Sequence, residues 1–233
     1  MSNGGYITAN LVTEVTGTAA RAAYPTANLH DGIGTLPCWW SSGTPTITVA
    51  ASGDCTGIAI CCHNLVAGAT LTVNSVAVTV TQGRSIWHKF PAATNSATIA
   101  INNSGTTVWI GEIVMGVATS FSRNFNYGYT QTESRFADEH VTEFGQLYAY
   151  PKFSQEVVSL PFGILDATTK TQLQELYRAA NGPVTPVLVI PDLADTPCVF
   201  GRLGASLGVT ASNFNLYSST LEIRSETTPA RLS

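Results

Sequence analysis

The sequence predicts a mainly β protein of two domains, an N-terminal β-sandwich and a C-terminal small β-barrel or sandwich that carries one α-helix. Three observations support this class. Short apolar runs alternate with polar residues between turn signals, 31 of the 233 residues are threonines, and only one stretch has a helical period. Threonine favours strands, and its hydroxyl makes an outward face polar without adding charge.

The first segment of the chain has the pattern of an antiparallel sandwich or jelly roll. Thr56–Cys62 (TGIAICC) is nearly continuous in small apolar residues, which is typical of a central strand buried on both faces. Asn74 and Ser75 separate two short alternating runs and favour a hairpin. The strands that we expect cover residues 46–51, 56–62, 70–80, 85–90, 97–102 and 107–117.

The second segment has one convincing helix, Asp166–Asn181. Asp166 is a good N-cap because its carboxylate can accept from the first free backbone amides. Gly182 supplies a stop at the other end, and Pro183 prevents continuation. Apolar residues recur on one face of the helix at spacings of three and four (Leu173, Leu176, Tyr177 and Ala180). Strands are expected around it at residues 156–161, 184–191, 198–203 and 215–225.

Charge is scarce and unevenly distributed. Asp, Glu, Lys and Arg make up 11% of the chain, against about 25% for an ordinary soluble domain. Residues 1–118 hold three basic and four acidic residues, whereas residues 119–233 hold eight and eleven. This shift predicts a boundary near residues 117–124 and domains covering residues 1–118 and 119–233.

The same composition excludes several classes of protein. A disordered chain combines low hydrophobicity with high charge, but hydrophobic residues here reach 44%. A protein that binds nucleic acid by neutralising phosphates needs a basic surplus, but the net charge is -4. We therefore expect no nucleic-acid partner, and a weakly charged surface that polar groups or other subunits cover.

The chain shows no targeting signal. Its N-terminus has no basic start and no long apolar run, so we expect no secretory signal. No stretch approaches the roughly 18 apolar residues of a membrane span. The odd count and irregular spacing of the cysteines favour free buried thiols in a chain made in the cytosol, the alternative being that some pair outside the cell. They are Cys38, Cys55, Cys61, Cys62 and Cys198.

No motif indicates catalysis. The chain has no G-x-S-x-G elbow, its four histidines lack metal-binding spacing, and the glycine-rich Gly201–Gly204 lacks the ending of a phosphate loop. Cys61-Cys62-His63 carries metal-ligand atoms, but the spacing is wrong for structural zinc pairs and adjacent strand residues point to opposite faces. We expect neither an enzyme nor a bound cofactor or metal.

A few residues are candidates for a ligand site or an interface. Trp39 and Trp40 can stack on sugars, although tryptophan lies more often in a core or an interface. His63 and Asn64 end a predicted strand, where hydrogen bonds to the turn are favoured over ligand contact. Tyr127 and Tyr129 belong to a tyrosine-rich stretch.

Several segments resemble structural proteins of tailed bacteriophages. In the first half, IAICCHNL, the aromatic stretch at Trp87 and TVWIGEIVMG resemble discoidin-like or galactose-binding-like β-sandwiches of those proteins. The second half resembles phage tail-tip and baseplate β-domains, in which two strands, one helix and further strands form a small barrel that joins a ring. The segments that carry this resemblance are FNYGYTQ, EFGQ, VSLPFGILDATTKTQLQELY, TPVLVIPD and EIRSE.

The resemblance implies a structural virion protein of a phage tail, at the tail tip, baseplate or neck. Such a protein acts by assembly with other tail proteins and with copies of itself in a ring, and it is assembled in the host cytoplasm. The family pattern contains no catalytic residue. The alternative is a host-receptor or carbohydrate-binding module that contacts a host-surface glycan through Trp39, Trp40 and the stretch Phe125–Tyr129.

Overall fold

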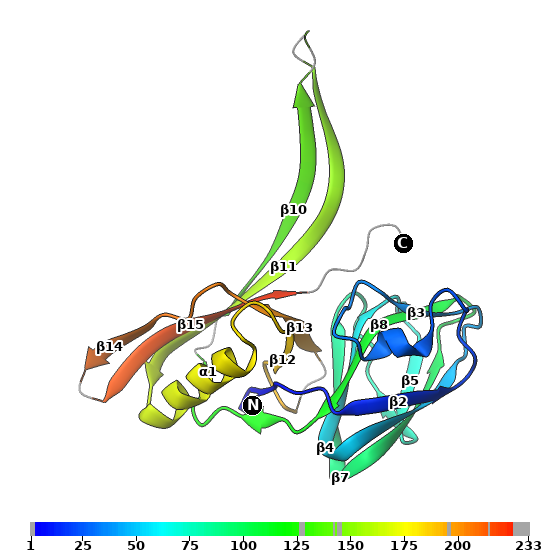
Figure 1. Ribbon diagram of the computed structural model, residues 1–233, viewed down its shortest axis with the longest axis horizontal. Coiled ribbons are helices and arrows are strands. Elements are labelled where there is room, and N and C mark those ends of the chain that lie inside the picture. Colours follow the sequence, from blue (N-terminus) through cyan, green and yellow to red (C-terminus); the bar gives the residue numbers. More distant parts are fainter. Residues whose placement is uncertain are drawn as a thin grey trace.

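Strands dominate the computed structural model, which describes residues 3–125, 129–141, 143, 146–194, 197–213 and 215–225, without the side chains of residues 135–139, 149–154 and 212 (Figure 1). The strands join into one large antiparallel sheet beside one α-helix, which confirms the mainly β class. The first half of the chain contains β1 (Gly5–Ile7), β2 (Val12–Gly17), a 3-10 helix (Thr26–Leu29), β3 (Cys38–Trp40), β4 (Thr46–His63), β5 (Thr70–Val73), β6 (Val76–Val78), β7 (Ser85–Asn102) and β8 (Val108–Gly116). The second half contains β9 (Thr119–Ser120), β10 (Thr130–Val141), β11 (Leu147–Leu165), α1 (Ala167–Ala179), β12 (Val187–Ile190), β13 (Pro197–Leu203), β14 (Val209–Asn213) and β15 (Leu216–Ser225).

Strand β4 is the centre of the first half. It pairs with β7 on one side and β8 on the other, so that Ile58 lies between His88 and Met115. Residues 57–63 are all buried, and the predicted central strand is confirmed. Strands β4 and β7 are each longer than predicted, because irregularities in their ladder between Ala50 and Gly57 let two runs continue as one bent strand.

The predicted hairpin and helix are both present. Asn74 and Ser75 join β5 to β6 with positive φ angles of 49° and 66°. The Asp166 side chain accepts a hydrogen bond from the Thr169 amide at 2.7 Å and caps α1. At the other end Asn181 and Gly182 adopt left-handed conformations, and the Gly182 amide donates to the Tyr177 carbonyl.

Three clusters of buried apolar residues hold the fold together. One cluster contains residues of the first half only, and a second is built around α1 and strands β11, β12, β13 and β15. The third joins both halves, since it contains Trp87 and Val114 together with Leu188 and Phe200. Strand β1 also pairs with β12 and β9, and β13 pairs with β7. The division into domains 1–118 and 119–233 stays a prediction.

All five cysteines are free and buried, as the sequence predicts. Burial raises the pKa of Cys38 to about 12. It also raises the pKa of Cys61 well above its usual value, and a contact with Cys198 adds to this effect. The Cys38 and Cys61 thiols are therefore protonated and unreactive at neutral pH, because the thiolate is the nucleophile.

Candidate functional site

The most distinctive element is a two-stranded arm formed by β10 and β11 (Figure 1). It projects away from the rest of the molecule. The two strands pair from Thr130 and Ser159 at the body to Val141 and Leu147 at the far end, with one bulge after Phe136. From Glu133 to Val141, at about 3.3 Å per residue, the arm extends roughly 30 Å.

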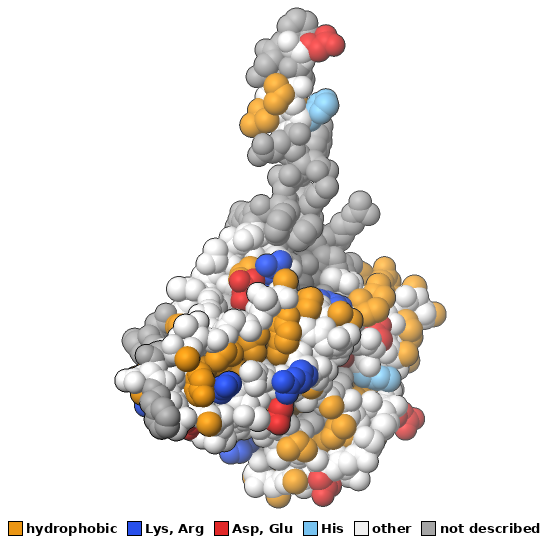
Figure 2. Space-filling view, turned by 60° about the vertical axis from the view of Figure 1, so that its left-hand side comes forward, with side chains coloured by type: hydrophobic (Ala, Val, Ile, Leu, Met, Phe, Trp, Pro, Cys, Tyr) orange, Lys and Arg blue, Asp and Glu red, His pale blue; other side chains and the backbone are white. Residues whose placement is uncertain are grey.

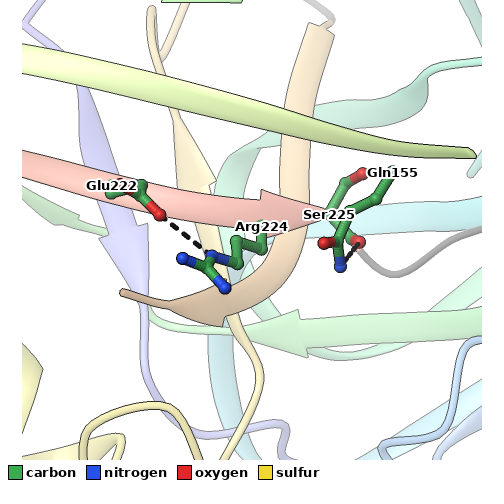
Figure 3. Close-up of polar contacts among 4 residues, drawn as sticks. All are labelled: Gln155, Glu222, Arg224 and Ser225. Carbon is green, nitrogen blue, oxygen red and sulfur yellow. Dashed lines mark hydrogen bonds and ion pairs between the residues drawn. The ribbon is translucent and has the colours of Figure 1, made fainter. Parts of the chain in front are cut away.

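The arm begins where β15 ends. Val157 is the outermost residue of β11 that pairs with β15, opposite Arg224. Just beyond it, the Glu156 amide donates to Ser225 Oγ at 3.1 Å. Gln155 Nε2 donates to the Ser225 carbonyl at 3.5 Å (Figure 3). Past this point β11 pairs only with β10 among the described residues. Within the described part of the chain, the arm is thus a hairpin without a third strand.

The end of the arm presents apolar side chains on both faces. Val141 and Leu147 are directly paired and each 60% exposed, so they lie on one face. Tyr148 pairs with His140 on the opposite face and is 49% exposed. A hairpin end of this kind loses water-exposed apolar surface on both sides when a partner encloses it.

A small cavity lies where the arm meets the first half. Its volume is about 70 Å³. The first half contributes His63 and Arg84 to its lining. The other side consists of Gln131 and Glu156 from the arm strands and of Tyr129, which immediately precedes β10. Arg84 Nη2 donates to Gln131 Oε1 at 3.1 Å. This hydrogen bond connects the start of β10 to the turn that precedes β7.

Burial shifts the pKa of two side chains that line this cavity, His63 and Glu156. It lowers the pKa of His63 to about 4, against an opposing backbone contact with Arg84. Neutral His63 accepts from the Leu65 amide through Nδ1 at 3.2 Å, which leaves the proton on Nε2. Burial also raises the pKa of Glu156, while the nearby Arg84 lowers it and Glu133 raises it. These groups line the same partly dehydrated cavity at the arm root.

Trp39 and Trp40 lie on opposite sides of β3. Trp40 is fully buried in the core of the first half, and its Nε1 donates to the Thr18 carbonyl at 2.9 Å. This placement leaves it no surface for a sugar. Trp39 is half-buried, with the Arg21 guanidinium 4.4 Å from its ring centre and the tilted Tyr24 ring 5.3 Å from it.

Asn64 connects strands rather than facing a cavity. Its Nδ2 donates to the Thr107 carbonyl and its Oδ1 accepts from the Trp109 amide, both at 2.9 Å. Tyr129 is exposed and packs edge-on against Phe125 with ring centres 5.8 Å apart. Tyr127 lies outside the described residues.

Among the described candidate residues, the structure therefore places two in the same cavity and the others elsewhere. His63 and Tyr129 line the same cavity at the arm root, whereas Trp39 and Trp40 belong to β3. Sequence reasoning missed Arg84 and Glu156, which also line this cavity. The sequence did contain a signal for Arg84, because it is one of three basic residues in positions 1–118.

No three His, Cys, Asp or Glu side chains among the described residues are arranged to hold a metal ion. In that part of the chain no helix has the length and apolar character needed to cross a membrane. Comparison with known protein families, with curated proteins and with solved structures finds no match to this chain.

Proposed function

We propose that this protein is a structural subunit of a bacteriophage tail, located at the tail tip, baseplate or neck. It acts by assembling with copies of itself and with neighbouring tail proteins, and not by catalysis. The proposal combines the resemblance of the sequence to phage tail proteins with one structural observation, the projecting β10–β11 arm.

The arm supports an assembly role because a hairpin of this kind is unstable by itself. An isolated two-stranded hairpin is marginally stable in water and requires a further strand or a packing partner. The β10–β11 arm obtains neither from the described body of its own chain beyond Val157. A second molecule that encloses Val141, Leu147 and Tyr148 would supply the missing contacts.

The surface of the body also favours protein partners. Charged side chains are few and scattered on the face that Figure 2 shows, and uncharged polar and hydrophobic groups cover most of it. Charge depletion is the compositional mark of the central part of protein interfaces. A weakly charged surface is also poorly protected against association.

Immunogold electron microscopy tests the location. Antibodies raised against the chain should label one end of the tail in purified particles of a phage whose genome encodes it. Particles that carry no label, while a capsid antibody labels their heads, would contradict the proposal. Mass spectrometry of the same particles provides an independent count of the copies.

A second function, binding of a host-surface glycan, is favoured by the Trp39 cluster. Trp39 keeps part of its ring at the surface, next to the Arg21 guanidinium and the Tyr24 ring. Aromatic and arginine side chains of this kind bind the faces and hydroxyls of sugars. On a glycan array, Trp39→Ala should lose the signal of the wild type, while Tyr148→Ala on the arm should keep it. A wild type that binds no glycan would remove this function.

A further inference from the structure

The cavity at the arm root is lined by a hydrogen-bond donor that lacks an acceptor. His63 is only 6% exposed, and its Nδ1 is occupied by the Leu65 amide. Its Nε2, which carries the proton of the neutral ring, is buried and has no hydrogen-bond partner among the described residues. Most buried polar atoms of proteins do have a partner, which is either another protein group or an ordered water. This N–H group therefore requires an acceptor in the cavity.

The arm supplies an acceptor to the same cavity. Glu156 lines it from β11 and is half-buried. Its backbone amide donates to Ser225, but no described residue donates a hydrogen bond to its carboxylate. Arg84 also lines the cavity, but the hydrogen bond of its Nη2 goes to Gln131. The cavity thus brings an unused donor of the body together with an unused acceptor of the arm.

The space and the charges of the cavity suit a water molecule. Its volume of about 70 Å³ exceeds the roughly 10–15 Å³ that one ordered water requires. No direct hydrogen bond joins His63 to Glu156, so a molecule between them has to accept from one and donate to the other. Water does both and is neutral, whereas Glu156 repels an anion and Arg84 repels a cation. Buried Val158 and Phe200 in the lining separate part of the site from bulk solvent.

We propose that this cavity binds an ordered water molecule that accepts from His63 Nε2 and donates to the Glu156 carboxylate. His63 is the last residue of β4 in the body, and Glu156 is the first residue of the arm beyond the β15 pairing. The water therefore connects the body to the arm and adds a second link to the Arg84–Gln131 hydrogen bond. This inference concerns a contact within one chain and does not depend on the proposed tail function.

Crystallography of the full chain, at a resolution that shows ordered water, tests the site directly. Density is expected for a water within about 3.2 Å of both His63 Nε2 and a carboxylate oxygen of Glu156. A map without a water that reaches both atoms would overturn the inference. The same holds for a structure in which Nε2 donates directly to the carbonyl of Arg84, whose backbone lies near this ring.

A pair of variants tests whether the water connects the arm to the body. Glu156→Leu removes the acceptor but keeps the backbone hydrogen bond to Ser225. It should lose the density of the bridging water, and the amides of residues 129–132 should exchange with deuterium faster than in the wild type. The matched control is Glu133→Leu, because Glu133 pairs with Glu156 across the arm but does not line the cavity. This control should keep both the water and the wild-type exchange rates. Equal exchange in the two variants, or a water unchanged in Glu156→Leu, would refute the bridge.

Discussion

At the scale of single residues, adjacent positions on a strand have very different roles. Trp39 and Trp40 follow each other in β3, where successive side chains point to opposite faces. Trp40 therefore enters the core and hydrogen-bonds Thr18, while Trp39 stays near the surface beside Arg21. The sequence alone left both a ligand role and a core or interface role open for the pair, because the face that is buried depends on β8, which lies 70 residues away.

The two tryptophans should differ strongly in their effect on stability. Trp40→Ala removes a fully buried ring and should lower the free energy of unfolding by about 3–5 kcal/mol. Trp39→Ala should lower it less, because solvent already reaches part of its ring. Urea denaturation followed by circular dichroism measures both. Equal losses would contradict the assigned burial.

His63 should make stability depend on pH. Its pKa is about 4 in the folded protein, against an ordinary value of 6.5. Between these values the unfolded chain binds a proton that the folded chain does not, so the free energy of unfolding falls as pH falls from 6.5 to 4. The full effect is up to about 3 kcal/mol. Above pH 6.5 the contribution of His63 is constant.

Denaturant titrations at several pH values check this expectation. His63→Asn should show a smaller loss of stability between pH 6.5 and 4 than the wild type, whereas His140→Asn on the exposed arm should follow the wild type. Burial lowers the pKa of His88 as well, but that residue is present in all three proteins. Identical pH profiles for His63→Asn and the wild type would refute the role of His63.

At the scale of elements, local sequence rules succeed where the neighbours of an element in the chain decide its structure. Helix α1 is the clearest case, because Asp166 and Gly182 are close in sequence to the ends that they terminate. The hairpin at Asn74 and Ser75 has the same origin. The merged strands β4 and β7 were missed, because polar residues at an irregular ladder resemble a turn in the sequence.

The helix cap offers a direct test at this scale. Asp166→Ala removes the side-chain acceptor of the Thr169 amide and should cost about 1 kcal/mol of unfolding free energy, the typical value for an N-cap. Thr168→Ala, one position into the exposed first turn of α1, is the matched control and should have little effect. A loss for Thr168→Ala as large as that for Asp166→Ala would contradict the capping role.

The arm could not be predicted from the sequence, for a physical reason. A strand is recognised by an apolar face that packs on a core, and most of β10 has no core to face. The stretch Thr130–Val141 instead mixes Glu133, Arg135 and Asp138 with polar residues, a pattern that resembles an ordinary solvated surface. The cavity at the arm root depends on this arm, so its grouping of His63 with Tyr129 was equally hidden.

Substitutions at the arm end should leave folding unchanged. The double variant Val141→Lys/Leu147→Lys alters two exposed residues and should shift the free energy of unfolding of dilute protein by no more than about 0.5 kcal/mol per site. Urea denaturation at low concentration measures it. A loss of several kcal/mol would mean that the arm end supports the fold and not an interface.

At the scale of the whole molecule, the scarcity of charge and the projecting arm both favour association with other protein molecules. The body combines two segment-specific cores with a third that joins them and contains residues of both halves, such as Trp87 and Phe200. The sequence predicted the mainly β class because strand patterning persists along most of the chain. It did not predict the joint core, which depends on residues more than a hundred positions apart.

The central claim is that the molecule functions as an assembling subunit through its arm. The most direct test is the mass of the particle in solution, measured by analytical ultracentrifugation over a range of concentrations. Wild-type protein should form species at multiples of the 24.6 kDa chain. Val141→Lys/Leu147→Lys should remain monomeric, and the control Val76→Lys should assemble like the wild type. A wild type that stays monomeric, or an arm variant that assembles equally well, would contradict the account.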